Sequence, residues 1–483
     1  MSGTVVSFAG FAPDIDPTTP GVITDCSNLV PTLRGYAGGK SGVDIGMDAL
    51  AAAAITASVV TKLDGTHRTF VGTETKLYEK SGTAWADVSR VAAYNASADF
   101  PWRFAQFGDT SLAVNKGDVI QASSSGVFSD LAAPKAAVMC ATSGFVMLGN
   151  TNEATYGESM DRWWCSEYLV HTGWTPAIST QCTTGRLVDT PGAITGMKAL
   201  GADVVAYKDR SMYFGRYVGP PGVWDFSLLP GESGCSSQEA IADIGAAHVF
   251  IGYDDIYIFD GSRPKSIGSP LREWFFADLD PAYRHKIRSA HDRNNALVYF
   301  HYPRVGNSGG LNGCIVYNYK ADRWGVAHRA IETPIEYVTD GYTYDTLPVT
   351  TWDSWPNVTY ESPFWTASTK YVAYIGSDHK VYSLTGASAS ATMTTGDYGA
   401  EDNYSLLSRV TLRYLSKPTT ASMTNHYQDE HGGAWTEDAT IAESSGRFDV
   451  LRSSVWHRVK FSFTGDFEIS GAATATTEPD GVY

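Results

Sequence analysis

The sequence predicts an all-β protein: a β-propeller of six or seven blades with an additional C-terminal β-sandwich-like domain. Short runs of Val, Ile, Tyr and Phe alternate with Gly-Asp, Asp-Gly and Ser-Gly turns, while helical periodicity is nearly absent. Aromatic residues make up 12% of the chain and charged residues only 18%, which suits short strands better than long charged helices. In addition, one unit of strand, polar turn and aromatic-rich strand recurs along the chain.

Each copy of this unit ends on a large aromatic ring, beginning with RTFVGTETKLYEKSGTAW, which ends at Trp85. We interpret these rings as blade-packing anchors: Trp85, Phe128, Trp174, Trp224, Trp274 and Trp324. The last four are spaced 50 residues apart, and the earlier intervals are 43 and 46 residues. A period of about 40 to 50 residues is typical of propellers, because a blade that is apolar on both faces must stack against its neighbours. The alternative is a chance alignment of tryptophans in an all-β chain.

The pattern divides the chain into four parts. Residues 1–55 are expected to form an N-terminal arm and a closing strand, and residues 56–330 the propeller blades. Residues 331–400 form an acidic, aromatic-rich excursion, after which YVAYIGSDHKVYSLTG returns to the blade pattern and supplies closing strands. Residues 401–483 contain at least five short strands, enough for a separate C-terminal β domain.

Negative charge is concentrated after the predicted blades. The stretch from Ile331 to Leu407 has ten acidic and two basic residues, and its net charge of −8 is half of the chain's −16. Such a block is usually a solvated face, and the functional alternative is a surface that must not adhere to a polyanion. The candidate channel acids are Asp340, Asp345 and Asp353. The candidate interface aromatics are Trp352, Trp355 and Trp365, whose alternative role is packing within one long loop.

The composition also limits which partners the protein can bind and in which cellular compartment it is expected. A surface this acidic repels phosphate, so tight wrapping of nucleic acid is excluded, whereas transient passage of DNA is not. The six cysteines are widely spaced, which favours reduced, buried thiols and a cytosolic assembly route. The N-terminal MSGTVVSFAGFAPD is not a signal peptide, and the most apolar run, residues 49–60, is too short for a membrane-spanning segment.

Catalytic, cofactor and metal motifs are not found. In GGKS at residues 38–41, Arg34 stands where a phosphate-binding loop needs glycine. His285 and His291 are six residues apart, which does not suit a zinc pair on one helix turn. Sialidase chemistry needs an arginine cluster, a tyrosine nucleophile and an acid, and the S-x-D-x-G-x-x-W turn of those propellers does not occur. We therefore expect a protein that is not an enzyme and that has no cofactor.

Several stretches resemble the tail nozzle or hub proteins of short-tailed bacteriophages, the family that includes packaged-DNA stabilisation proteins. They are TPGVITDCSNLVPTLRGYAGG, GTETKLYEKSGTAWADVSR, WRFAQFGDTSLAVNKGD and DDIYIFDGSRPKSIG, and the resemblance covers roughly residues 10–330. It implies a structural virion protein with a propeller-like platform that forms a homohexameric ring. Such a ring continues the DNA channel below the portal and its adaptor ring, retains the packaged genome and allows its ejection.

The resemblance also implies partners and a location. The adaptor ring would lie above, tail needle, fibre or tip proteins below, and double-stranded DNA would pass through transiently. The protein would reside in the virion tail after assembly in the host cytoplasm. Two rival functions remain open. One is a propeller glycan-binding or glycan-cleaving protein, such as a tailspike or sialidase-like enzyme, and the other is a monomeric cytosolic scaffold without virion partners.

Overall fold

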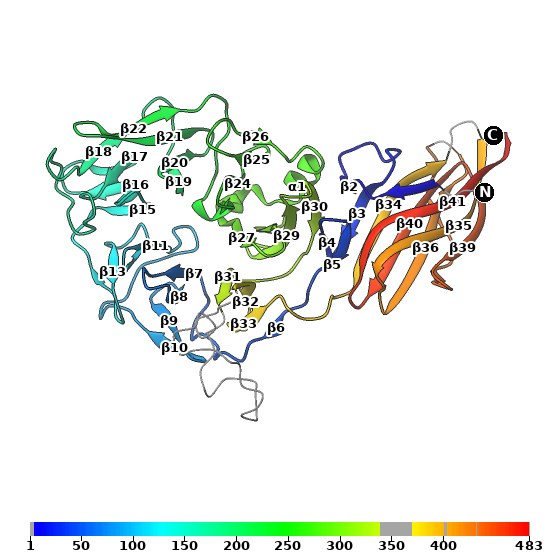
Figure 1. The fold of residues 1–483 in the computed structure, drawn as a ribbon, viewed down its shortest axis with the longest axis horizontal. Coiled ribbons are helices and arrows are strands. Elements are labelled where there is room, and N and C mark those ends of the chain that lie inside the picture. The colour runs from blue at the N-terminus through cyan, green and yellow to red at the C-terminus, as the bar shows by residue number, and fades with distance from the viewer. Residues whose placement is uncertain (1–3, 339–369, 400–402, 431, 483) are drawn as a thin grey trace, which may run out of the picture.

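The computed structural model describes residues 4–338, 370–399, 403–430 and 432–482. The chain forms a propeller, seen end-on at the left of Figure 1, and a β-sandwich at the right. The predicted fold class, an all-β propeller with an additional sandwich-like domain, is confirmed.

Within the described residues, six units of the ring are separate four-stranded antiparallel sheets, here called blades. The first three comprise β7 (Thr56–Thr61), β8 (His67–Gly72), β9 (Leu77–Ser81), β10 (Ala84–Asp87), β11 (Arg103–Phe107), β12 (Thr110–Val114), β13 (Gln121–Ser123), β14 (Ser129–Asp130), β15 (Lys135–Thr142), β16 (Phe145–Glu153), β17 (Gly157–Cys165) and β18 (Thr183–Arg186). The next two comprise β19 (Ile194–Leu200), β20 (Asp203–Lys208), β21 (Met212–Gly219), β22 (Val223–Leu228), β23 (Ile241–Asp243), β24 (His248–Ile251), β25 (Ile256–Phe259) and β26 (Lys265–Ser266). The last comprises β31 (Thr333–Val338), β32 (Lys370–Ile375), β33 (Val381–Ser383) and β6 (Val43–Asp44).

A further four-stranded unit completes the ring but belongs to a larger sheet. It comprises β27 (Arg288–Asp292), β28 (Leu297–Pro303), β29 (Leu311–Asn318) and β30 (Arg323–Val326). The first strand of each unit faces the ring axis, and β31 packs against β7, which closes the circle. The outermost strand of the last blade, β6, comes from the N-terminal part of the chain and pairs with β33.

The sandwich is built from both ends of the chain. One of its sheets continues from β30 through β4 (Leu29–Pro31), β5 (Tyr36–Gly38), β41 (Glu468–Val482), β35 (Asn403–Ser416) and β39 (Phe448–Ser454), with β1 (Thr4–Ser7) on β41. The other comprises β2 (Gly10–Phe11), β3 (Val22–Ser27), β34 (Ala391–Gly399), β40 (Trp456–Thr464), β36 (Thr420–Gln428) and β37 (Thr436–Glu437), with β38 (Ile441–Ala442) on β36. Short helices η1 (Gln238–Ala240), α1 (Arg272–Asp278) and η2 (Pro281–Lys286) connect propeller strands.

The residue boundaries of the sandwich differ from the sequence prediction in both the N-terminal and the C-terminal part of the chain. Residues 1–55 are more than an arm with a closing strand, because β1 to β5 are strands of the sandwich. Their buried Phe8, Phe11 and Ile23 need an apolar core, and the sandwich supplies it. Similarly, β34 lies before residue 401 but pairs with β3 and β40, with Met393 in that core.

One sheet therefore runs through both halves of the molecule. Its ten strands include β27–β30 of the ring and β4, β5, β41, β35, β39 and β1 of the sandwich. The largest hydrophobic cluster follows it and contains Phe250 and Trp324 from the ring as well as Phe461 from the sandwich. Main-chain hydrogen bonds and a shared core thus hold the two domains in a fixed orientation.

Tyr36 lies at the junction and is completely buried. Its hydroxyl donates to the main-chain oxygen of Trp324 (2.9 Å) and accepts from the main-chain N–H of Phe11 (2.8 Å). Burial raises the pKa of Tyr36, so the hydroxyl stays protonated and keeps both bonds. The Trp324 indole in turn donates to the main-chain oxygen of Ile267 (3.0 Å), which extends the link to the preceding blade.

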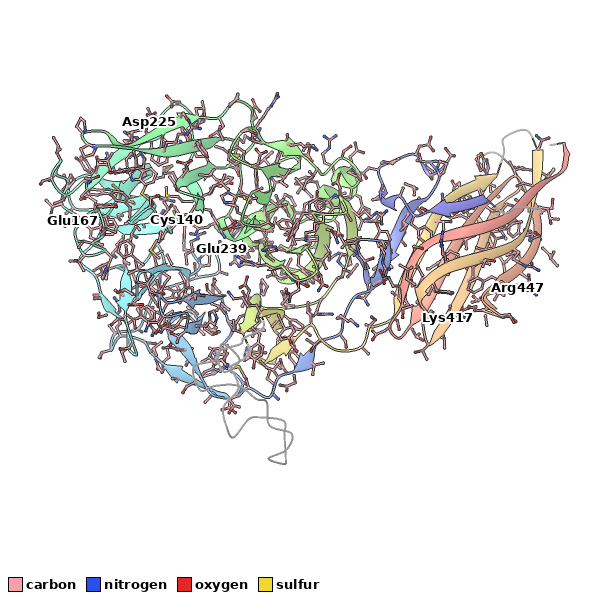
Figure 2. The ribbon with its side chains drawn as sticks, viewed as in Figure 1. Cys140, Glu167, Asp225, Glu239, Lys417 and Arg447 are labelled. Atoms are coloured by element: carbon pink, nitrogen blue, oxygen red, sulfur yellow. The ribbon has the colours of Figure 1, made fainter. Side chains whose placement is uncertain are left out.

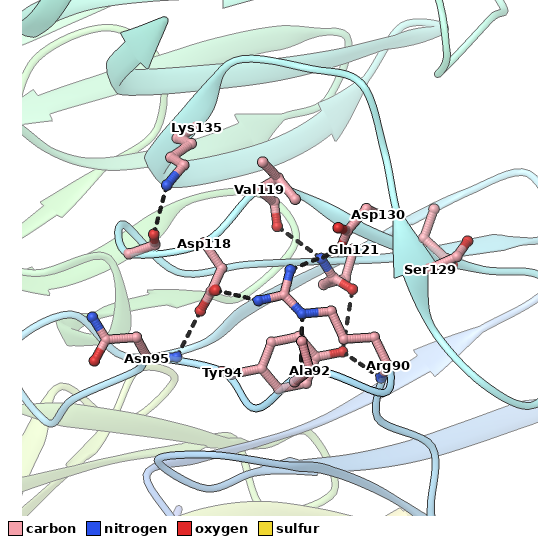
Figure 3. Close-up of polar contacts among 12 residues, drawn as sticks. Arg90, Ala92, Tyr94, Asn95, Asp118, Val119, Gln121, Ser129, Asp130 and Lys135 are labelled. Carbon is pink, nitrogen blue, oxygen red and sulfur yellow. Dashed lines mark hydrogen bonds and ion pairs between the residues drawn. The ribbon is translucent and has the colours of Figure 1, made fainter.

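The loop between the first two blades is fixed by an ion-pair network around Arg90 (Figure 3). The guanidinium contacts Asp118 at 2.5 Å and Asp130 at 2.7 Å, and its side chain is 18% exposed. The Tyr94 hydroxyl accepts from the main-chain N–H of Arg90 (3.0 Å) and donates to Gln121 Oε1 (3.2 Å). One arginine therefore holds a loop that has no strand of its own against the second blade.

We expect Arg90→Ala to lower the free energy of unfolding by about 2 kcal/mol, because it leaves the poorly exposed Asp118 without its counter-charge. Arg186→Ala is the matched control. Its pair with Asp161 is also an arginine–aspartate contact, but Arg186 is 54% exposed, so the loss of stability should be clearly smaller than for Arg90→Ala. Urea unfolding of both variants measures the difference, and equal losses would contradict the assigned role.

Candidate functional site

The strongest candidate site is the cavity at the ring axis, with a volume of about 340 Å³. Its wall consists of the inner strands β7, β11, β23, β27 and β31, one residue of β19, and helix η1. In Figure 2 Glu239 of η1 lies near the middle of the ring. Seven charged side chains line the cavity: Arg103, Lys198, Glu239, Asp243, Arg288, Arg293 and Glu336.

Helix η1 brings inner strands of different units together. Gln238 donates to the main-chain oxygen of Met139 on β15 (2.9 Å), and the main-chain oxygen of Glu239 accepts from Ser289 on β27 (2.8 Å). Ser237 begins the helix, since its Oγ accepts from the Glu239 N–H and donates to the Glu239 carboxylate (2.7 Å). On β19, a Cβ at Gly196 would lie 2.8 Å from Ile241 and 3.2 Å from the Gln238 Cα, so glycine allows η1 to approach.

Glu239 forms the electrostatic centre of the cavity. Arg103 reaches it with two N–H groups, Nε at 2.8 Å and Nη2 at 3.1 Å, and also donates to the main-chain oxygen of Ala137. Arg288 approaches the same carboxylate to 3.6 Å. Burial alone would raise the pKa of Glu239, but the charges of Arg103 and Arg288 outweigh it and hold this pKa at about 2. Burial also lowers the pKa of Arg288.

This arrangement limits what the cavity can do chemically. A general acid must carry a proton at the working pH, and Glu239 is held ionised, so it cannot supply one. The other lining carboxylates serve local contacts: Asp243 accepts from the main-chain N–H of Gly245 (2.7 Å), and Glu336 lies 3.7 Å from Lys370. Among the described residues, no group of three or more His, Cys, Asp or Glu side chains could hold a metal ion.

The predicted anchors occupy unequal positions. Trp85, Trp224 and Trp324 lie on fourth strands (β10, β22 and β30), and Phe128 directly precedes β14. Two of them meet a ring of the adjacent blade, Phe128 with Phe70 (5.2 Å between centroids) and Trp224 with Phe145 (5.7 Å).

Trp174 and Trp274 do not lie on fourth strands. Trp174 lies in the loop between β17 and β18, yet it is buried in one cluster with Leu112 of the second blade and Val146 of the third, as a blade-packing residue should be. Trp274 lies in α1, where it contacts Phe11 of the sandwich (5.2 Å), so the prediction is wrong there. The reason is that long loops and a helix lengthen these units, so equal sequence intervals do not mark equivalent strand positions.

The predicted channel acids and interface aromatics lie outside the described residues, namely Asp340, Asp345, Asp353, Trp352, Trp355 and Trp365. Conversely, sequence reasoning did not single out Arg103, Glu239 or the role of Arg288 at the axis. The available signal was an arginine at the first position of each of two strands, RFAQF and RSAHD, because an arginine that becomes buried there needs a carboxylate to compensate its charge.

The cysteines lie inside the blades and the sheets. All six are buried, and none forms a disulfide. Burial raises the pKa of the Cys140, Cys235 and Cys314 thiols to about 12, which makes them unreactive in the folded protein. They therefore offer no nucleophile to the axial cavity.

No protein-family model matches the chain, and no curated protein matches it. Among solved structures the chain is similar to YCF48 bound to D1 peptide, with 11% identity, 72% of this chain and 95% of that chain covered, and a TM-score of 0.38. It is also similar to the Pan2 WD40 domain of Neurospora crassa (9% identity, 71% and 95% covered, TM-score 0.39) and to an exo-beta-1,3-galactanase of Phanerochaete chrysosporium (10%, 89% and 100%, TM-score 0.29). At these identities the likeness concerns the propeller fold alone. In the part of the chain that the structure describes, no helix has the length and apolarity needed to cross a membrane.

We expect Glu239→Gln to destabilise the protein by about 3 kcal/mol at pH 7, because it leaves two buried guanidinium groups without a carboxylate. The native pKa of about 2 lies below the ordinary 4.5, so ionised Glu239 stabilises the fold above pH 4.5, and this contribution is lost as pH falls toward 2.

Urea unfolding between pH 7 and pH 3 measures both effects. Between pH 7 and pH 3 the free energy of unfolding of the wild-type protein should fall by about 2 kcal/mol because of Glu239. Glu239→Gln should not show this part of the decrease. Asp243→Asn, a neighbouring exposed carboxylate on β23, is the control and should retain the wild-type pH profile. If Glu239→Gln and the wild type had identical pH profiles of stability, the ion pairs of Glu239 would not stabilise the axial cavity.

Proposed function

We propose that the protein is a structural component of a bacteriophage tail, a nozzle or hub subunit that assembles as a homohexameric ring in the host cytoplasm. The ring continues the DNA channel below the portal and adaptor, retains the packaged genome and allows its ejection. The observation that supports this best is the ten-stranded sheet that joins ring and sandwich. A ring that holds DNA under load needs subunits of fixed shape, and a continuous hydrogen-bonded sheet provides one.

The stretches that resemble nozzle proteins lie at informative places in the fold. TPGVITDCSNLVPTLRGYAGG, residues 19–39, contains β3, β4 and β5, the strands at the junction of the two domains. GTETKLYEKSGTAWADVSR and WRFAQFGDTSLAVNKGD contain strands of the first two blades and end near the Arg90 network. The resemblance thus covers both the ring and its connection to the sandwich.

The axial cavity is not the route for DNA in this proposal. Its volume is only about 340 Å³, with η1 in its wall, which is too little space for a duplex whose major groove alone is about 12 Å wide. The channel would therefore lie between copies of the chain. The net charge of −16 favours such a conduit, because an acidic wall repels phosphate and does not retain it.

A propeller glycan-binding or glycan-cleaving protein is the second candidate. The observation that favours it is the polar axial cavity with its three carboxylates and three arginines. The ionised state of Glu239 speaks against hydrolysis at this position. Binding or cleavage of a glycan by the isolated monomer or trimer would favour this candidate over the nozzle.

We expect the purified protein to form hexamers, alone or when mixed with its adaptor ring, because a ring subunit needs a neighbour on each side. Mass photometry over a concentration series measures the mass. Quantitative mass spectrometry of purified particles should then find the chain at about half the copy number of the adaptor. A protein that stays monomeric in both settings and is missing from particles would refute the proposal.

We further expect the triple variant D340N/D345N/D353N to slow DNA ejection, because removing negative charge from a channel wall lowers its repulsion of phosphate. Ejection from purified particles, followed by dye fluorescence, measures the rate. D203N/D209N/D225N, which changes three acids of the fourth blade β19–β22 and its loops, is the charge-matched control. Unchanged retention and ejection in the first variant would remove these acids from the channel.

A further inference from the structure

The axial cavity contains polar groups that the described residues do not satisfy. Arg288 Nη1 on β27, Thr56 Oγ1 on β7 and Gln238 Oε1 on η1 are buried and have no hydrogen-bond partner. All three residues line the same cavity, although they come from different parts of the chain. Buried polar groups are normally paired, so three unpaired groups around one cavity mark positions where water or a ligand completes the network.

Arg288 is the most informative of these groups. Its side chain is 6% exposed, and its one contact with a counter-charge is the 3.6 Å approach to Glu239. Arg103 differs, because its N–H groups are bonded to both oxygens of Glu239 and to Ala137. The carboxylate is also bonded to Ser237. Glu239 is thus already engaged by Arg103 and Ser237, and Nη1 of Arg288, the atom nearest the carboxylate, is buried without a hydrogen-bond partner.

The charges around the cavity are unequal. Four cations line it, namely Arg103, Lys198, Arg288 and Arg293, against three carboxylates, namely Glu239, Asp243 and Glu336. His291 also lines the cavity, and burial lowers its pKa, so it is neutral at pH 7. Among the described lining residues one positive charge is therefore in excess, in a protein whose net charge is −16.

We propose that the axial cavity binds a small monocarboxylate, with Arg288 as its main ligand. A guanidinium offers a planar pair of N–H donors that matches the two oxygens of a carboxylate. A monoanion neutralises the single excess charge, whereas a dianion such as sulfate would leave a buried negative charge. The carboxylate comes from a free small acid or from the acidic side chain of a peptide segment that enters the ring axis, and the chemistry of recognition is the same.

Thermal unfolding in sodium acetate tests the proposal, with sodium chloride and sodium sulfate at equal ionic strength for comparison. Wild-type protein should show a saturable rise in Tm with acetate and a smaller one with either other salt. Arg288→Gln should weaken the apparent acetate affinity about 10- to 100-fold, the loss expected when a charge-assisted hydrogen bond is removed. Arg263→Gln, an exposed arginine after β25, is the matched control and should respond as wild type.

Two further variants separate ligand binding from a purely structural role. Arg288→Lys keeps the charge but loses the paired donors, so it should fold normally and bind acetate more weakly than wild type. Glu239→Gln raises the excess to two positive charges and should therefore shift the preference from acetate towards sulfate. A structural ion pair would instead lower Tm equally in all three salts.

Isothermal titration calorimetry with a terminally blocked Gly-Asp-Gly peptide distinguishes the two sources of the carboxylate, a free small acid and an acidic side chain of a peptide segment. If the peptide binds more tightly than acetate, the natural ligand is an acidic side chain of a partner segment. If it binds more weakly, the natural ligand is a free acid. Both results support a carboxylate site. The proposal is overturned if acetate and chloride give the same Tm curves for wild type, or if Arg288→Gln responds to acetate as wild type does.

Discussion

The shape of the molecule depends on the main-chain hydrogen bonds that carry one sheet from β30 through β4 and β5 to β41. Two domains joined by a linker move relative to each other, whereas two domains that share a sheet do not. Tyr36 reinforces this joint, because its buried hydroxyl bonds to a strand of each domain. This joint sets the angle between the ring and the sandwich.

The ring itself is held in two different ways. Between blades most of the buried contacts are aromatic and aliphatic, as at Phe70 and Phe128, and they follow from the apolar faces of the strands. At the axis the contacts are ionic, because the inner strands converge there and η1 brings a carboxylate to two arginines. At the axial cavity, therefore, the stability of the ring depends on charge pairing more than on apolar packing. The same charges determine which ligand the cavity prefers.

The repeat was visible in the sequence because a blade is a local structure. Its strands are consecutive, and a ring such as Trp224 is buried near its own hairpin, so spacing alone predicts it. The sandwich was predicted only in part, because β1, β3 and β5 pair with strands more than three hundred residues away, and local patterns do not encode such partners. The axial charges were missed for the same reason: Arg103 and Glu239 are 136 residues apart and meet only in the closed ring.

The position of β6 affects how the protein can be made. The outermost strand of the last blade is residues 43–44, and its partner Ser383 lies 340 residues further along the chain. During translation the ring cannot close until that partner has left the ribosome, so an unpaired blade edge persists while most of the polypeptide is synthesised. Such edges promote aggregation, and slow ring closure therefore makes the yield of folded protein sensitive to chaperone supply and temperature during expression.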